Sequence, residues 1–158
     1  MPRAVLVLLL VFLGCADEDA MVQRPQRSAA GQAVNNALGE KTGVVHDVQM
    51  VGDVSTGFRF EPSELTIKVG DTVRWVNASG FPHNVAFYAD SIPNGANVII
   101  DAVMPADNKL GPMIGRIMSE SGETFEMDFL SAPSGTYRYF SAPQEASGML
   151  GTLIVELQ

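Results

Sequence analysis

Alternation of apolar and polar residues, broken by turn-forming residues, is the feature that most restricts the fold of this chain. It runs through residues 65–69, 72–75, 125–129 and 153–157, with one exception at Ile154. Period-two alternation places one face of a strand in a core and the other in water. Turn-forming pairs and triplets such as Gly70-Asp71 and Pro133-Ser134-Gly135 separate these stretches. The pattern predicts an all-β antiparallel sandwich with Greek-key connections.

Residues 1–14 show the pattern of a secretory signal, with a basic start, an apolar run over 4–13 and the small residue Gly14. The apolar run is too short to span a bilayer, which needs about 20 such residues. The run ends in Phe12-Leu13-Gly14-Cys15, which resembles the lipobox of bacterial lipoproteins. The resemblance implies that Cys15 is lipidated and anchors the chain to a membrane. The alternative is that the single cysteine stands there by chance.

Two further regions follow the signal. Residues 15–42 lack a sustained apolar period and are expected to form a flexible linker after the lipidated cysteine. Residues 43–158 are expected to form one domain. The formal net charge of -8 disfavours nucleic acid as a partner. From the signal and Cys15 we expect an exported protein of the bacterial cell envelope, on the periplasmic side of the outer membrane if the cell is Gram-negative. Its protein partner is not identified by the sequence.

Four stretches of the domain carry a family pattern: FRFEPSELTIKVGDTVRWVNASGFPHNVAFYADSIPNGA, MPAD, SGETFEMDF and SGTYRYFSAPQEASGMLGTLIVE. In them the domain resembles the plastocyanin/azurin family of blue (type 1) copper proteins, the cupredoxins. This resemblance implies a cupredoxin-like Greek-key β-sandwich. It also implies a copper site made by a histidine in the PHN segment and by a cysteine, a histidine and a methionine in the final loop.

Two of the four implied copper ligands are replaced. His83 falls on the first histidine and Met149 on the axial methionine, but Ser141 stands at the cysteine and Gln144 at the second histidine. A hydroxyl does not ionise near neutral pH and cannot replace a thiolate, and an amide oxygen is a poorer copper ligand than imidazole. Phe140 also stands where plastocyanins usually have a tyrosine. We therefore expect copper to be absent or weakly bound and the protein to be a non-redox binding or structural module.

Several interpretations of the site remain open. In one, His83 and Met149 bind copper weakly, completed by water or Glu145, for trafficking or residual electron transfer, or a dimer partner supplies the missing ligands. In another, His83 is hydrogen-bonded beside Asn84 and Met149 fills the space of the metal. Two histidines and no second thiol leave no nucleophile–base set, so an enzyme is not expected. A docking surface is expected around Phe81, Pro82, Pro143, Met149 and Leu150.

The sequence supports four smaller expectations. By resemblance, the bonds before Pro62 and Pro82 are cis. The segment 101–121 is expected to hold a short helical turn, and its methionines Met104, Met113 and Met118 to fill gaps in the core rather than bind copper. His46 is expected to be exposed on the first strand.

Overall fold

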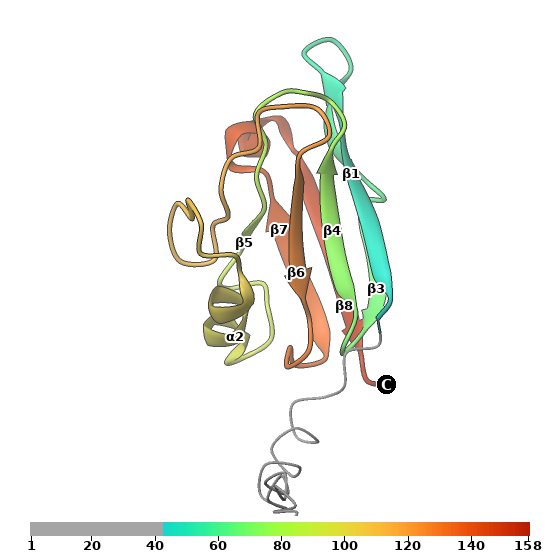
Figure 1. The fold of residues 1–158 in the computed structure, drawn as a ribbon, viewed down its shortest axis with the longest axis vertical. Coiled ribbons are helices and arrows are strands. Elements are labelled where there is room, and N and C mark those ends of the chain that lie inside the picture. The colour runs from blue at the N-terminus through green and yellow to red at the C-terminus, as the bar shows by residue number, and fades with distance from the viewer. Residues whose placement is uncertain (1–42) are drawn as a thin grey trace, which may run out of the picture.

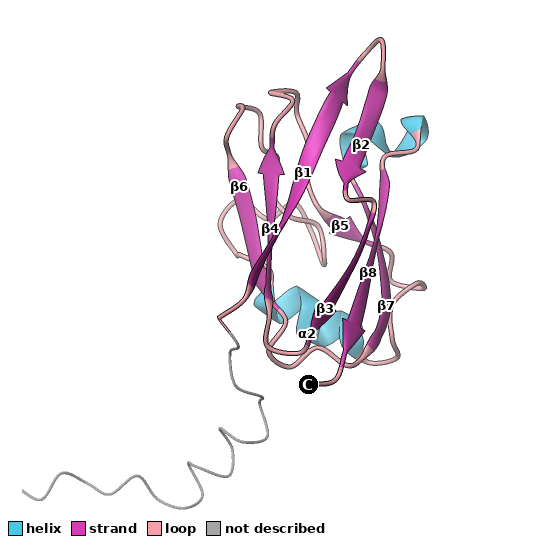
Figure 2. Ribbon diagram, turned by 90° about the vertical axis from the view of Figure 1, so that its right-hand side faces the viewer, coloured by secondary structure: helices cyan, strands magenta, loops and turns pink. Residues whose placement is uncertain are grey.

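The computed structural model describes residues 43–158; the signal, Cys15 and the linker lie outside the described residues. Two four-stranded sheets face each other (Figures 1 and 2). The first sheet has the order β2 (Gly57–Glu61), β1 (Val45–Asp53), β4 (Thr72–Asn77) and β6 (Thr124–Asp128). The second has the order β3 (Glu64–Lys68), β8 (Leu150–Glu156), β7 (Gly135–Phe140) and β5 (Ala86–Phe87). The predicted all-β sandwich is thus confirmed.

The expectation that all strands are antiparallel is wrong. β1 pairs with β4 in parallel, and β3 pairs with β8 in parallel, while the other pairs are antiparallel. Alternation fixes which face of a strand is buried but is the same for both directions of a neighbour. The pattern therefore defined the strands and their inner faces but could not define the sense of pairing.

The inner faces of both sheets form one aromatic core. Trp75 on β4 lies against Phe87, Phe125 and Tyr139, with ring centroids 5.6–6.4 Å apart. Phe60 meets Tyr139 edge-on at 4.8 Å. These side chains are almost fully buried, so they hold the two sheets in a fixed relation and, with them, the loops at either end.

A helix covers one open side of the sandwich at the end opposite the β1–β2 turn (Figure 1). α2 (Ala96–Val103) begins after the turn at Pro93-Asn94-Gly95 and buries Ala96 and Ile100. The helical turn expected within 101–121 therefore lies mostly before that segment, because Ala96 and Ile100, four positions apart, supply its buried face. Met104, Met113 and Met118 are all buried in the core cluster, as gap-filling side chains would be.

Two local expectations need correction. The Glu61–Pro62 bond is cis as expected, but it is the one cis bond among residues 43–158, so the expectation for Phe81–Pro82 is wrong. His46 is not fully exposed: its side chain is 26% exposed and its Nε2 lies 2.8 Å from Oδ2 of Asp71. Asp71 is buried in the β3–β4 turn, where the Lys68 N–H also donates to its carboxylate. A buried carboxylate requires such partners, and His46 supplies one.

Candidate functional site

Two loops at the β1–β2 end of the sandwich bring together residues from distant parts of the sequence. One follows β4 and carries His83; the other joins β7 to β8 and contains the 3-10 helix η1 (Ala142–Ser147), the second helix seen in Figure 2. Ser141 precedes η1, and Gly148 follows it with a φ of 82°, a conformation that favours glycine. Backbone bonds close this loop: Gln144 N–H donates to Ser141 O at 2.9 Å and Met149 N–H to Gln144 O at 3.2 Å.

The side-chain oxygen of Gln144 is the centre of the site. It lies 2.8 Å from His83 Nδ1 and accepts a hydrogen bond of 2.9 Å from the Ser141 hydroxyl. Ser141 Oγ is also 3.4 Å from His83 Nδ1. Because an amide oxygen only accepts, His83 must carry its proton on Nδ1. Three of the four implied ligand positions therefore satisfy one another.

The other nitrogen of His83 faces the loop after β4. His83 Nε2 lies 2.8 Å from Ser79 Oγ, and Asn77 Oδ1 accepts the Gly80 N–H at 3.0 Å. A neutral imidazole with its proton on Nδ1 accepts at Nε2, so the Ser79 hydroxyl donates to it. Burial lowers the pKa of His83 from its ordinary value of 6.5, and the bond to Gln144 raises it by less. His83 is therefore neutral at pH 7, with both nitrogens occupied.

Asn84, next to His83, connects the loop after β4 to the loop that contains η1. Its Oδ1 accepts the Ala142 N–H at 2.7 Å, and its Nδ2 donates to Gly115 O at 3.2 Å. The interpretation that placed the hydrogen bonds of His83 beside Asn84 is therefore only partly right. The partners of His83 are Ser79, Gln144 and Ser141, whereas Asn84 fixes the start of η1 against the 111–118 segment.

Met149 closes the loop on the inner side. It is fully buried in the core cluster, and its carbonyl oxygen accepts the Ser141 N–H at 3.2 Å. The expectation that Met149 contributes to an exposed docking surface is wrong, because β8 starts at Leu150 and its alternation points Met149 inward. Whether Met149 binds a metal stays a prediction.

The residues at the four positions do not fit a type 1 copper ion. The donors are one imidazole, one thioether, a neutral hydroxyl and an amide oxygen, and the imidazole Nδ1 is already bonded to Gln144. Blue copper sites need two imidazoles and a thiolate around the metal. Within residues 43–158 no group of three or more His, Cys, Asp or Glu side chains could hold a metal ion.

Apolar residues surround the site on the surface. Phe81 and Leu150 are 38% and 37% exposed, and Pro82 and Pro143 are exposed as well. The Phe58 ring packs edge-on against both Phe81 and His83, at 5.2 and 5.3 Å between centroids. Four residues of the expected docking surface thus lie at one end of the sandwich.

The surroundings of Tyr88 and the exposure of Val54 could not be seen in the sequence. Tyr88 stacks on Phe140 with 4.3 Å between ring centroids, and its hydroxyl donates to Glu145 Oε1 at 2.8 Å. Val54, at the β1–β2 turn, is 84% exposed at the same end. Tyr88 and Val54 both lie outside the alternating stretches, so no periodicity marked them. Glu145, considered above as a further ligand, instead accepts from Tyr88.

Together, the sandwich and its ligand loop define a cupredoxin. The family described as copper binding proteins, plastocyanin/azurin family, matches residues 46–156, so this chain belongs to it. Plastocyanin of Scenedesmus fuscus is 42% identical over 106 residues, covering 67% of this chain and 95% of that protein. Chloroplastic plastocyanin of Chlamydomonas reinhardtii is 39% identical over 106 residues, 67% of this chain and 64% of that protein.

The solved structures agree with this family. The oxidised form of plastocyanin from Dryopteris crassirhizoma superposes with a TM-score of 0.52 at 29% identity, and the superposition covers 70% of this chain and all of that one.

Among residues 43–158, none of the helices has the length and apolar character that a membrane-spanning helix requires.

Proposed function

We propose that this protein is a lipid-anchored, plastocyanin-like module of the bacterial cell envelope that binds a protein partner and carries no type 1 copper. The observation that carries the proposal is the closed hydrogen-bond network of His83, Ser141 and Gln144. A family member without a thiolate and with its histidine bonded to an amide lacks the ligand set of a blue copper electron-transfer site.

The same network supports a binding role. The loop residues that would surround the metal are fixed by backbone bonds, by Asn84 and by the shared oxygen of Gln144. The end of the sandwich stays ordered by its own contacts, with Phe81, Pro82, Pro143 and Leu150 exposed around it. A preformed apolar surface loses little conformational entropy when a partner binds.

Copper titration tests the absence of a metal role. The mature chain with Cys15→Ser is titrated with copper(II) by visible absorption and with copper(I) by competition against a chelator of known affinity. We expect no blue absorption band and no tight binding in either oxidation state. Tight binding that His83→Ala removes and His46→Ala retains would overturn the proposal and favour copper trafficking through His83 and Met149. His46 is the matched control, since it is the only other histidine.

Photo-crosslinking in the native host tests the binding role. A photoreactive residue at Leu150 is expected to give a discrete crosslinked product, whereas one at Thr66, exposed on β3, is expected to give none. Equal patterns at both positions would count against a docking surface at the site end. Metabolic labelling with palmitate, with Cys15→Ser as control, tests the anchor separately.

A further inference from the structure

Three side chains at the site have the geometry of an activated serine. Ser79 Oγ lies 2.8 Å from His83 Nε2, and His83 Nδ1 lies 2.8 Å from Gln144 Oε1. A hydroxyl becomes nucleophilic when an imidazole is placed to accept its proton and a third group fixes the imidazole. The sequence did not reveal this set, because Gln144 lies 61 positions after His83 and no spacing connects the two.

The protons of the set lie where this chemistry requires them. Gln144 accepts from Nδ1 of His83, so Nε2 carries no proton and accepts from the Ser79 hydroxyl. Asn77 Oδ1 also lies 3.0 Å from Ser79 Oγ, but it already accepts the Gly80 N–H at 3.0 Å. The unprotonated Nε2 is therefore the base that receives the hydroxyl proton.

Ser79 is the member of the set that solvent reaches. It is half-buried between two exposed residues, whereas His83 is fully buried. The exposed side chains of Phe81 and Pro82 follow in the same loop. A small molecule can thus approach the hydroxyl but not the imidazole, and the apolar neighbours favour a molecule with an apolar part.

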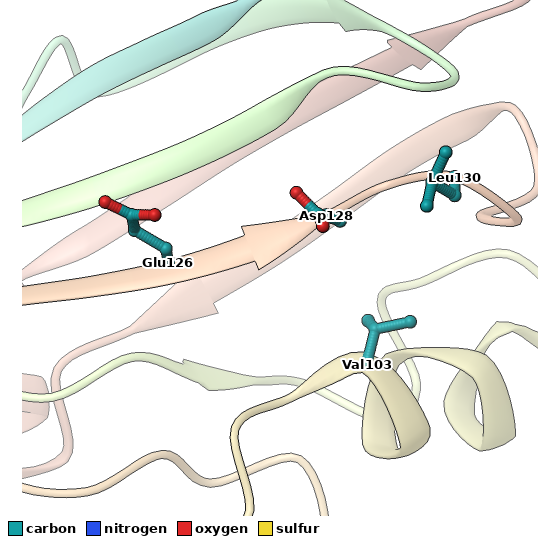
Figure 3. Close-up of a pocket in the computed structure, with 4 residues that line it drawn as sticks. All are labelled: Val103, Glu126, Asp128 and Leu130. Atoms are coloured by element: carbon teal, nitrogen blue, oxygen red, sulfur yellow. The ribbon is translucent and has the colours of Figure 1, made fainter. Parts of the chain in front are cut away.

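The cavity between α2 and β6 contains no comparable set. Its volume is about 330 Å³, and the described residues that line it are Val103, Glu126, Asp128 and Leu130 (Figure 3). None of these four side chains is a hydroxyl or an imidazole. The nucleophilic chemistry of the domain is therefore expected at the loop after β4 and not in this cavity.

We propose that Ser79 is an acylation site that takes an acyl group from an activated donor, such as a thioester or an aryl ester. Ser79 Oγ attacks the carbonyl carbon of the donor while its proton passes to His83 Nε2. The bond from that carbon to the leaving group then breaks, and the leaving group keeps the electron pair and takes the proton from His83. The product is an ester on Ser79. This chemistry goes beyond the binding role proposed above and does not depend on it.

The loop favours a single acylation over repeated turnover. Fast ester hydrolysis needs N–H groups that are free to stabilise the oxyanion of the tetrahedral intermediate. The N–H groups of this loop already have acceptors: Met50 O for residues 78 and 79, Asn77 Oδ1 for Gly80, Ser79 Oγ for Phe81 and Met118 O for His83. The acyl group is therefore expected to stay on Ser79.

Acetylation by 4-nitrophenyl acetate tests the site on the mature chain with Cys15→Ser. Peptide mass mapping follows the acetylation of each serine, and Ser134, an exposed serine directly before β7, is the control within the same chain. We expect Ser79 to be acetylated about tenfold faster than Ser134 or more, since a positioned general base accelerates proton transfer. Equal rates at the two serines would overturn the proposal, and this comparison needs no variant.

Three variants separate the base from the group that positions it. His83→Gln is expected to lower the rate at Ser79 to that of Ser134. Gln144→Ala is expected to lower it about tenfold, because the imidazole loses its acceptor, and Gln144→Glu, which keeps an acceptor, to preserve it. Urea unfolding identifies the variants that are folded. An unchanged rate at Ser79 in folded His83→Gln would overturn the proposal.

Discussion

Removing the amide of Gln144 tests the centre of the site directly. In Gln144→Ala, His83 Nδ1–H and the Ser141 hydroxyl lose their shared acceptor, at 2.8 and 2.9 Å. Both donors belong to fully buried residues, so water does not readily replace the lost partner. A buried donor left unsatisfied costs about 1–3 kcal/mol. Because Gln144 itself is half-buried and Ser141 can turn toward His83 at 3.4 Å, we expect a combined loss of about 2 kcal/mol.

The assay is urea unfolding of the mature chain, with thermal melting alongside. A loss of about 2 kcal/mol corresponds to a fall of roughly 6–12 °C in Tm for a domain of this size. Ser141→Ala in the Gln144→Ala background should cost less than Ser141→Ala alone, since the acceptor of the hydroxyl is already gone. The matched control is Ser147→Ala, which changes an exposed side chain of the same loop. A loss below about 0.5 kcal/mol for Gln144→Ala would refute the shared-acceptor geometry.

Three further predictions follow from the site and the core. Ser141→Cys with Gln144→His should produce a blue copper(II) absorption band, because the frame around the two positions is that of the family; a folded but colourless double variant would contradict this. The pKa of His83 is lowered in the folded state, so the unfolded chain binds its proton more readily; stability is full above pH 6.5 and falls as the pH drops below that value. His83→Gln should remove that part of the pH dependence of the unfolding free energy, measured by urea unfolding at several pH values. Gly151→Ala should destabilise the domain by several kcal/mol, because a Cβ there would lie 2.2 Å from Cζ of Tyr139; an unchanged unfolding midpoint would show that Tyr139 is free to move.

The sequence was sufficient for the strands and for the family, because both leave local marks. Alternation located β3, β4 and β6 to within a residue or two and β8 to within three, and the PHN segment and the final loop marked the site. The parallel pairing of β1 with β4 left no such mark, because it depends on which strands become neighbours in the folded sheet.

The geometry of the site was predictable only in part. The replaced positions could be named from their spacing, but the shared acceptor at Gln144 depends on how η1 turns its amide toward His83. The partner of His46 was missed because Asp71 lies in a turn 25 positions along the chain. Met149 and Leu150 are adjacent in sequence, but Met149 is fully buried and Leu150 is 37% exposed, because β8 begins at Leu150 and its residues alternate between the two faces.

The parallel pairing of β3 with β8 has a consequence for the order in which the domain forms. Leu65 is level with Leu153, almost 90 positions later, so β3 has no neighbour in its sheet until β8 is available. Closing so long a loop has a large entropic cost before the contacts between the strands form, which slows folding. The second sheet therefore cannot be completed before β8 has been synthesised, so a nascent chain is still unable to finish the sandwich when only β1 to β7 have been made.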